Sequence, residues 1–294
     1  MRKHEYFSIS SKNFTFAKIY LKTEMIEFVS FGSGSSGNCY FLSVGNTTLI
    51  IDSGVGVRNL KKYTRDYGLR LDKVEAILIT HDHADHVKSV GVISNEYGIP
   101  VYATDAVHRG IEHNYCVRKK IDVMNKRVIE PGRMFSIGGL NIMPFEVPHD
   151  SCGNVGYRIE CGNGENFCLM TDIGHVTEDI RHNVSLADYL VVEANHDESM
   201  LLHGPYPQYL KERVKGDFGH LSNVSCAELI RDYASSRLKH VWLCHLSEEN
   251  NHPELLRKTM EDILQSDTEK RAYVVDILKR KVPSEIYELG EERQ

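Results

Sequence analysis

The fold of this 294-residue chain is decided by the stretch Thr80-His81-Asp82-His83-Ala84-Asp85-His86. Residues 74–80, which lead into it, are apolar and rich in β-branched side chains, and this pattern predicts a short buried strand. Residues 87–97 after it have helical spacing, and Gly98 and Pro100 end that helix. Three histidines and two aspartates therefore follow the carboxyl end of a strand, where open α/β sheets place their ligand sites.

This histidine-rich turn predicts a metal site, because imidazole and carboxylate groups are ligands of Zn²⁺, Mn²⁺ and Fe²⁺. A turn cannot wrap four potential ligands within six residues around one tetrahedral ion. The natural division gives His81 and His83 to one ion, and Asp85 and His86 to a second. The alternative is a solvated, histidine-rich loop, but burying several titratable groups together without a metal would cost free energy.

The composition bounds the class of protein. With 41% hydrophobic residues the chain can form a large core, and it lacks the apolar run of about 18 residues that a transmembrane helix needs. Seven cysteines without Cys-x-x-Cys spacing favour free thiols, and hence a cytoplasmic location. A net charge of −6 argues against a broad basic surface that coats nucleic acid. It does not exclude a nuclease, since metal ions can supply the positive charge that meets a phosphate.

We expect one domain over residues 25–282. Residues 1–24 show no clear period and are interpreted as a peripheral extension, with an added strand or an upstream start before Met25 as alternatives. Residues 200–217 are the least regular part of the sequence and resemble an insertion or lid. Residues 283–294 are expected to form a charged, frayed tail.

Polar residues also follow five further predicted strands. They are Asp52, His149, Asp172, the segment Glu193 to His196, and His245. Helices alternate with the strands, so these strand ends can converge at one edge of a sandwich. Taken alone, each has an ordinary alternative: Asp52 could be a turn cap, and a lone histidine is more often structural.

The loop Gly32-Ser33-Gly34-Ser35-Ser36-Gly37-Asn38 lies between two predicted strands. Its small residues would let backbone N–H groups approach an anion closely, together with the side chains of Ser35, Ser36 and Asn38. We therefore consider it a site for a substrate phosphate, with a merely flexible Gly-Ser loop as the alternative.

The pattern His-x-His-x-Asp-His after a strand resembles the signature of the metallo-β-lactamase superfamily, and the resemblance extends from Ile26 to about Leu278. It implies an αββα sandwich, in which two mixed sheets pack face to face with helices outside. It also implies one ion bound by His81, His83 and His149, and a second bound by Asp85, His86 and His245. Asp172 would bridge the two ions, and Asp52 and His196 would lie behind the ligands.

Two later segments, Glu193-Ala194 and Gly219-His220-Leu221-Ser222, resemble the carboxylate and histidine pair of the transfer-RNA 3′-end-processing branch. By this resemblance Glu193 orients His220, which protonates the leaving oxygen as a general acid. The alternative is that His220 only begins a helix. The residues expected to carry the reaction are His220, Glu193 and Asp85.

In motif order and spacing the chain resembles the YycJ/WalJ-type group, bacterial proteins regarded as 5′-to-3′ DNA exonucleases. This resemblance implies two divalent ions, Mn²⁺ or Zn²⁺, with a metal-bridging hydroxide as nucleophile and DNA with a 5′ end as substrate. One alternative is a ribonuclease, or an ester, thioester or lactone hydrolase, of the same fold. Another is a non-catalytic metal-binding regulatory protein.

Overall fold

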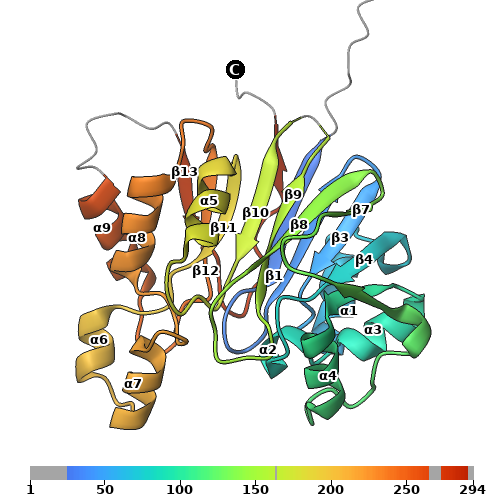
Figure 1. Cartoon of the computed structure of the whole chain (residues 1–294), viewed down its shortest axis with the longest axis horizontal. Helices are drawn as coiled ribbons and strands as arrows, with labels where there is room; N and C mark the ends of the chain where they lie inside the picture. The colour runs from blue at the N-terminus through green and yellow to red at the C-terminus, as the bar shows by residue number, and fades with distance from the viewer. Residues whose placement is uncertain (1–24, 163, 265–272, 291–294) are drawn as a thin grey trace, which may run out of the picture.

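The structure is a computed structural model that describes residues 25–162, 164–264 and 273–290. The predicted extension over residues 1–24 lies outside them. Two seven-stranded sheets pack face to face, and helices cover their outer faces (Figure 1). The predicted αββα sandwich is therefore confirmed.

The first sheet has the strand order β14-β1-β2-β3-β4-β5-β6. Pairing is antiparallel from β14 to β3 and parallel from β3 to β6. Its strands are β1 (Ile26–Gly32), β2 (Cys39–Val44), β3 (Thr47–Ile51), β4 (Val74–Leu78), β5 (Val101–Thr104), β6 (Lys126–Ile129) and β14 (Tyr287–Leu289).

The second sheet has the strand order β13-β12-β11-β10-β9-β8-β7 and, like the first, has an antiparallel half and a parallel half. Pairing is antiparallel from β7 to β10 and parallel from β10 to β13. Its strands are β7 (Phe135–Ile137), β8 (Leu140–Glu146), β9 (Val155–Glu160), β10 (Asn166–Met170), β11 (Tyr189–Glu193), β12 (His240–Cys244) and β13 (Val274–Ile277).

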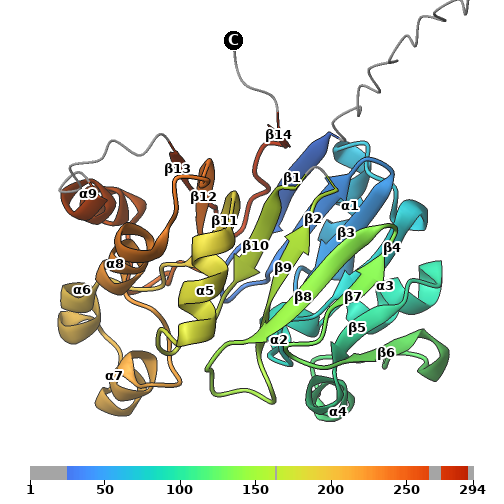
Figure 2. The same cartoon turned by 45° about the horizontal axis from the view of Figure 1, so that its top comes forward.

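The helices form the two outer layers (Figure 2). Beside the first sheet are α1 (Val57–Asp66), α2 (Ala84–Val87), α3 (Val90–Tyr97) and α4 (Asp105–His113). Beside the second are α5 (Glu178–Leu186), α8 (Asn223–Tyr233) and α9 (Pro253–Leu264), with α6 (Glu198–His203) and α7 (Gln208–Lys215) near α8. Short 3-10 helices lie at Leu71–Lys73 and Val123–Asn125. Among the described helices, none is long and apolar enough to cross a membrane.

Each strand contributes side chains to two apolar layers. In β1, Phe28 packs between the sheets whereas Phe31 packs against the helices of the first sheet. In β12, Trp242 faces the space between the sheets and Leu243 faces the helices of the second. Because both faces are covered, the strands are nearly continuous apolar runs in the sequence, as is usual for buried sheets.

Three segments differ from the sequence prediction. Residues 200–217, expected to be irregular, contain most of α6 and all of α7. The segment expected to be a frayed tail contains β14, which pairs with β1 and places Tyr287 against Phe28 at 6.2 Å between ring centroids. Strand β6 was not predicted, because it lies at an edge and exposes Arg127 and Val128.

We expect Phe28→Ala to lower the free energy of unfolding by about 3–5 kcal/mol, the usual cost of removing a buried phenyl ring. Phe28 is fully buried and contacts Trp242 and Phe167 between the sheets. Urea unfolding followed by Trp242 fluorescence measures the change. The control Tyr115→Ala removes a ring that is 91% exposed and should leave the unfolding midpoint unchanged; equal effects would contradict the assignment of Phe28 to the core.

Candidate metal centre

The predicted site residues lie at one edge of the sandwich, where strands of both sheets end. In the first sheet, Asp52 follows β3, and residues 80–86, which we call the histidine loop, follow β4. In the second sheet His149, Asp172 and His245 follow β8, β10 and β12, and Glu193 is the last residue of β11. The two sheets face each other, and each has an antiparallel half and a parallel half. This arrangement brings six strand ends together.

The structure groups all seven predicted ligands into overlapping sets whose ligand atoms lie within 4.8 Å of one another. One set is His81, His83 and His149, and another is Asp85, His86 and His245. These sets have the composition that the sequence analysis gave to the two ions.

Asp172 lies between the two sets. Its Oδ2 is 3.3 Å from Nε2 of His86, and its Oδ1 is 3.6 Å from Nε2 of His149 and 3.5 Å from Nδ1 of His245. A carboxylate in this position can reach an ion on either side, which is what the bridging role requires.

Unpartnered ring nitrogens indicate that the cluster suits cations. Nε2 of His81 and Nε2 of His149 are buried and have no hydrogen-bond partner among the described residues. Burial lowers the pKa of both imidazoles. A neutral imidazole with a free ring nitrogen is the form that binds a metal, so these residues fit divalent ions.

The carboxylates of the cluster attract positive charge. Burial disfavours the charged form of His245, but Asp172, Asp85 and Glu193 outweigh it and raise the pKa of His245 to about 10. Carboxylates raise the pKa of His86 against burial in the same way. Protons and metal ions therefore compete for these side chains.

Asp52 fastens the histidine loop to the turn after β3. Its Oδ2 lies 2.7 Å from Nδ1 of His86, and its Oδ1 accepts a hydrogen bond from the Thr80 backbone N–H at 2.9 Å. With Nδ1 held in this way, Nε2 of His86 points toward Asp172 and Asp85. Such hydrogen bonds set the orientation of a metal-binding imidazole.

Three residues of the site have a left-handed backbone. Asp52, Asp172 and His245 have φ values of 58°, 57° and 56°, and no other non-glycine residue in the described segments has positive φ. This conformation costs roughly 1–2 kcal/mol for an L-residue and persists only where its surroundings hold it. Each of the three lies within two residues of a strand end, so the chain reverses sharply there.

Glu193 connects four parts of the second sheet's edge. Its Oε1 lies 2.9 Å from Nδ1 of His220 and 2.9 Å from Nδ1 of His245, and its Oε2 accepts from the backbone N–H groups of Ile173 and Leu221 at 2.7 and 3.0 Å. Burial favours its neutral form, but His220 and His245 outweigh burial and lower the pKa of Glu193 to about 2. Glu193 in turn raises the pKa of His220 against burial.

The loop over residues 32–38 has an exposed part and a buried part. Ser35 and Ser36 are exposed. Asn38 is fully buried, and its Nδ2 lies 2.9 Å from Nε2 of His86 and 3.3 Å from Oδ2 of Asp85. The amide of Asn38 is thus engaged within the protein beside the cluster, whereas the two serines face solvent.

His196, expected behind the ligands, lines a cavity beside the cluster. It is 2% exposed, its Nδ1 has no hydrogen-bond partner among the described residues, and burial lowers its pKa to about 4. The neighbouring Asn195, which sequence reasoning missed, donates from Nδ2 to the His245 carbonyl oxygen at 2.9 Å.

Asp150 was also missed. Its Oδ1 lies 3.3 Å from Nε2 of His149 and 3.9 Å from Nε2 of His83, and Arg213 forms an ion pair with its carboxylate at 2.5 Å. The only sequence signal for Asp150 is its position directly after His149.

The chain is similar in sequence to a known family and to named proteins. The family model described as a beta-lactamase superfamily domain matches residues 47–245. Exodeoxyribonuclease WalJ of Streptococcus pneumoniae is 36% identical over 228 residues, which are 78% of this chain and 84% of that protein. Exodeoxyribonuclease YycJ of Bacillus anthracis is 31% identical over 240 residues, 82% of this chain and 89% of that protein.

The fold is shared with solved structures at lower identity. The crystal structure of the metallo-β-lactamase fold protein YhfI from Bacillus subtilis superimposes with a TM-score of 0.65 at 17% identity. The superposition covers 90% of this chain and 99% of that one. Together with the sequence matches, it confirms the resemblance that the motifs indicated.

We expect Gly54→Ala to weaken the binding of Zn²⁺ or Mn²⁺ by about 10–100-fold, the range for disturbing groups that hold metal ligands in place. A Cβ on Gly54 would lie 1.5 Å from the Asp85 backbone oxygen, so the histidine loop would have to move. The control is Gly56→Ala, because nothing lies within 4 Å of a Cβ there. Titration with a competing chelator measures the affinities, and unchanged binding in Gly54→Ala would contradict this prediction.

Proposed function

We propose a reaction for this chain, which belongs to the β-lactamase superfamily, has the metallo-β-lactamase fold and is a metal-dependent hydrolase. The reaction is the stepwise removal of nucleotides from the 5′ end of DNA by phosphodiester hydrolysis. The relatives named exodeoxyribonucleases support nucleic acid as the substrate. We propose Mn²⁺ or Zn²⁺ as the ions and the cytoplasm as the location, in keeping with seven unpaired cysteines.

The observation that carries the proposal is the position of Asp172 between two ligand sets, with the Glu193–His220 pair beside it. We assign the first ion to His81, His83 and His149, the second to Asp85, His86 and His245, and both to Asp172. When bound, two such ions lower the pKa of a shared water and neutralise negative charge on the phosphate.

His220 is the proposed general acid. Its Nδ1 lies 2.9 Å from Oε1 of Glu193 and 3.6 Å from Oδ1 of Asp172, so this nitrogen faces the protein. Glu193 holds the proton on Nδ1, and Nε2 is left to give its proton to the leaving oxygen as the bond to phosphorus breaks. A purely structural metal site would need no such pair.

Ser35 and Ser36 are the proposed contacts to the substrate phosphate beside the second ion. Both side chains are exposed, and the Lys88 ammonium group donates to the Ser36 carbonyl oxygen at 2.6 Å. A positive charge therefore lies at the backbone of this exposed serine pair, an arrangement suited to an anion. Asn38 would act by fixing the loop to Asp85 and His86.

Cleavage of DNA oligonucleotides labelled at either end, with Mn²⁺ or Zn²⁺ added, tests the proposal. We expect a 5′ label to be released as a mononucleotide at the earliest times, while a 3′ label passes through a ladder of shortening products. Release of the 3′ label first would contradict the polarity. Cleavage of RNA with DNA left intact would make the protein a ribonuclease, and turnover of a thioester or lactone alone would remove nucleic acid as its substrate.

Asp172→Ala should abolish both metal binding at the centre and DNA cleavage, because it removes the carboxylate shared by the two ligand sets. Elemental analysis of the purified variant and the end-label assay measure the two losses. The control Asp66→Ala removes an exposed carboxylate on α1 and should change neither. A fully metallated, active Asp172→Ala protein would contradict the bridging role.

His220→Ala should keep its metal content but cleave DNA about 10²–10⁴-fold more slowly, the range for loss of general acid catalysis. The matched control is His182→Ala, an exposed histidine on α5. Full activity in His220→Ala, or a parallel loss of metal, would remove the proposed role.

A further inference from the structure

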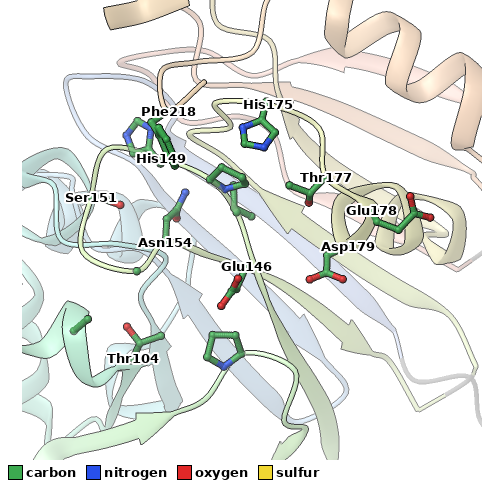
Figure 3. A pocket seen from close by; sticks show the side chains of 15 residues that line it. Thr104, Glu146, His149, Ser151, Asn154, His175, Thr177, Glu178, Asp179 and Phe218 are labelled. Carbon is green, nitrogen blue, oxygen red and sulfur yellow. The ribbon is translucent and has the colours of Figure 1, made fainter. Parts of the chain in front are cut away.

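Two cavities lie beside the candidate metal centre, and their linings differ in charge. One, of about 720 Å³, is lined by His149 and His175 together with the carboxylates of Glu146, Glu178 and Asp179 (Figure 3). Among the described residues, no lysine or arginine lines it. The other, of about 850 Å³, lies among α6, α7 and the start of α8 and includes His220 in its lining. Both have the size of typical small-molecule sites, about 300–1,000 Å³.

The chemistry of the proposed reaction decides which cavity receives which part of the DNA. A 5′ exonuclease that breaks the bond between phosphorus and O3′ expels the 5′-terminal nucleotide as the leaving group. The residue that protonates O3′ must touch this oxygen, so the sugar that carries O3′ lies against His220. Of the two cavities, His220 lines the one beside α7. The terminal nucleotide is therefore directed there.

The charges of this cavity suit a phosphate. Lys211 and Lys215 both line it, and their spacing of four residues puts them on one face of α7. The Lys211 ammonium group donates to the Leu202 carbonyl oxygen at 2.8 Å, and Lys215 has no ion-pair partner among the described residues. Two cations thus remain available to an anion.

The same lining also holds two carboxylates, which balance the two lysines in charge and accept hydrogen bonds from neutral groups. Glu198 accepts a hydrogen bond from the Ser222 hydroxyl at 3.3 Å, and Glu212 accepts one from the Gln208 amide at 2.9 Å. The cavity of Figure 3 has three carboxylates and lacks such cations in its described lining, so it would repel a nucleotide phosphate.

The same cavity offers an apolar wall and a buried polar group. Val176, Leu201 and Leu202 contribute apolar surface, and Leu202 is 66% exposed. His196 lines the cavity, is 2% exposed, and leaves Nδ1 without a partner in the described part of the chain. A flat nucleobase can cover apolar side chains of this kind and offer hydrogen bonds to a buried imidazole.

We propose that the cavity among α6, α7 and the start of α8 holds the 5′-terminal nucleotide of the DNA, with its 5′-phosphate at Lys211 and Lys215. This inference rests on the proposed function. In the step, water releases one proton to the solvent and its oxygen bonds to phosphorus, the P–O3′ bond breaks, and the electron pair left on O3′ takes the proton from His220. The nucleotide leaves with a 3′-hydroxyl, and the shortened strand keeps the phosphate as its new 5′ end.

The test compares metal-loaded wild type with the double variant Lys211→Ala/Lys215→Ala on DNA bearing a 5′-phosphate or a 5′-hydroxyl. We expect wild type to prefer the 5′-phosphate. The double variant should lose about ten-fold or more in kcat/KM on that substrate, since each ammonium group gives a charge-assisted hydrogen bond. Its rate on the 5′-hydroxyl substrate should stay at the wild-type value.

Calorimetric titration with thymidine 5′-monophosphate gives a readout independent of turnover. The double variant should bind this nucleotide about ten-fold or more weakly. The variant Glu212→Gln tests whether the sign of the charge in the cavity matters, because it removes a negative charge from the same lining. It should bind the nucleotide as tightly as wild type or more tightly.

The outcomes separate the inference from the proposed function. If wild type degrades DNA from the 5′ end but the double variant keeps both its 5′-phosphate preference and its nucleotide affinity, the inference is wrong and the proposed function stands. Equal losses in Glu212→Gln and in the lysine variant would likewise overturn the role of charge. If metal-loaded wild type leaves DNA intact, the proposed function fails and the inference fails with it.

Discussion

The edge of the second sheet depends on one buried carboxylate, that of Glu193. It accepts backbone hydrogen bonds from Ile173 and Leu221 and side-chain hydrogen bonds from His220 and His245. The loops after β10 and β12 and the segment before α8 are therefore fixed to the end of β11. A buried charge with so many partners is stable, but removal of any partner would leave it poorly compensated. The same interaction that orders these loops also orients the proposed general acid.

Asp52 has the corresponding place in the first sheet, where it holds Thr80 and His86 to the turn after β3. The two sheets thus each supply one buried carboxylate that positions histidines of the site. Between them, Asp172 and Asp85 surround His86 and His245 and raise the pKa of both. A metal ion that binds must displace protons from these imidazoles, so metal affinity should fall as the pH falls.

Much of this centre could be predicted from the sequence because its residues follow strands. His149, Asp172 and His245 each come after an apolar run, and the carboxyl ends of such strands meet at one edge. What the sequence did not reveal depends on contacts between distant segments. The inward-facing amide of Asn38, the bond from Asn195 to His245 and the carboxylate of Asp150 beside His149 have no local signature.

The helices and strands that the sequence did not predict were also missed for a common reason. Helices α6 and α7 are short, and α7 buries only Val214, so the apolar period is weak. Strand β14 has three residues and exists because β1 offers an unpaired edge. These segments are organised by what they pack against. Lys211 and Lys215 lie on such a segment, which is why no motif pointed to the cavity beside His220.

The left-handed backbone at Asp52, Asp172 and His245 explains why a motif alone does not make this site. Each residue must carry a side chain toward the cluster and also turn the chain sharply after a strand. Glycine would relieve the conformational cost but remove the carboxylate or imidazole, and asparagine, which tolerates this conformation, would remove the charge of an aspartate. The residues that the turns disfavour are therefore the ones that the chemistry needs. Because hydrogen bonds from both sheets must hold them there, the site can form only when the whole sandwich has closed around it.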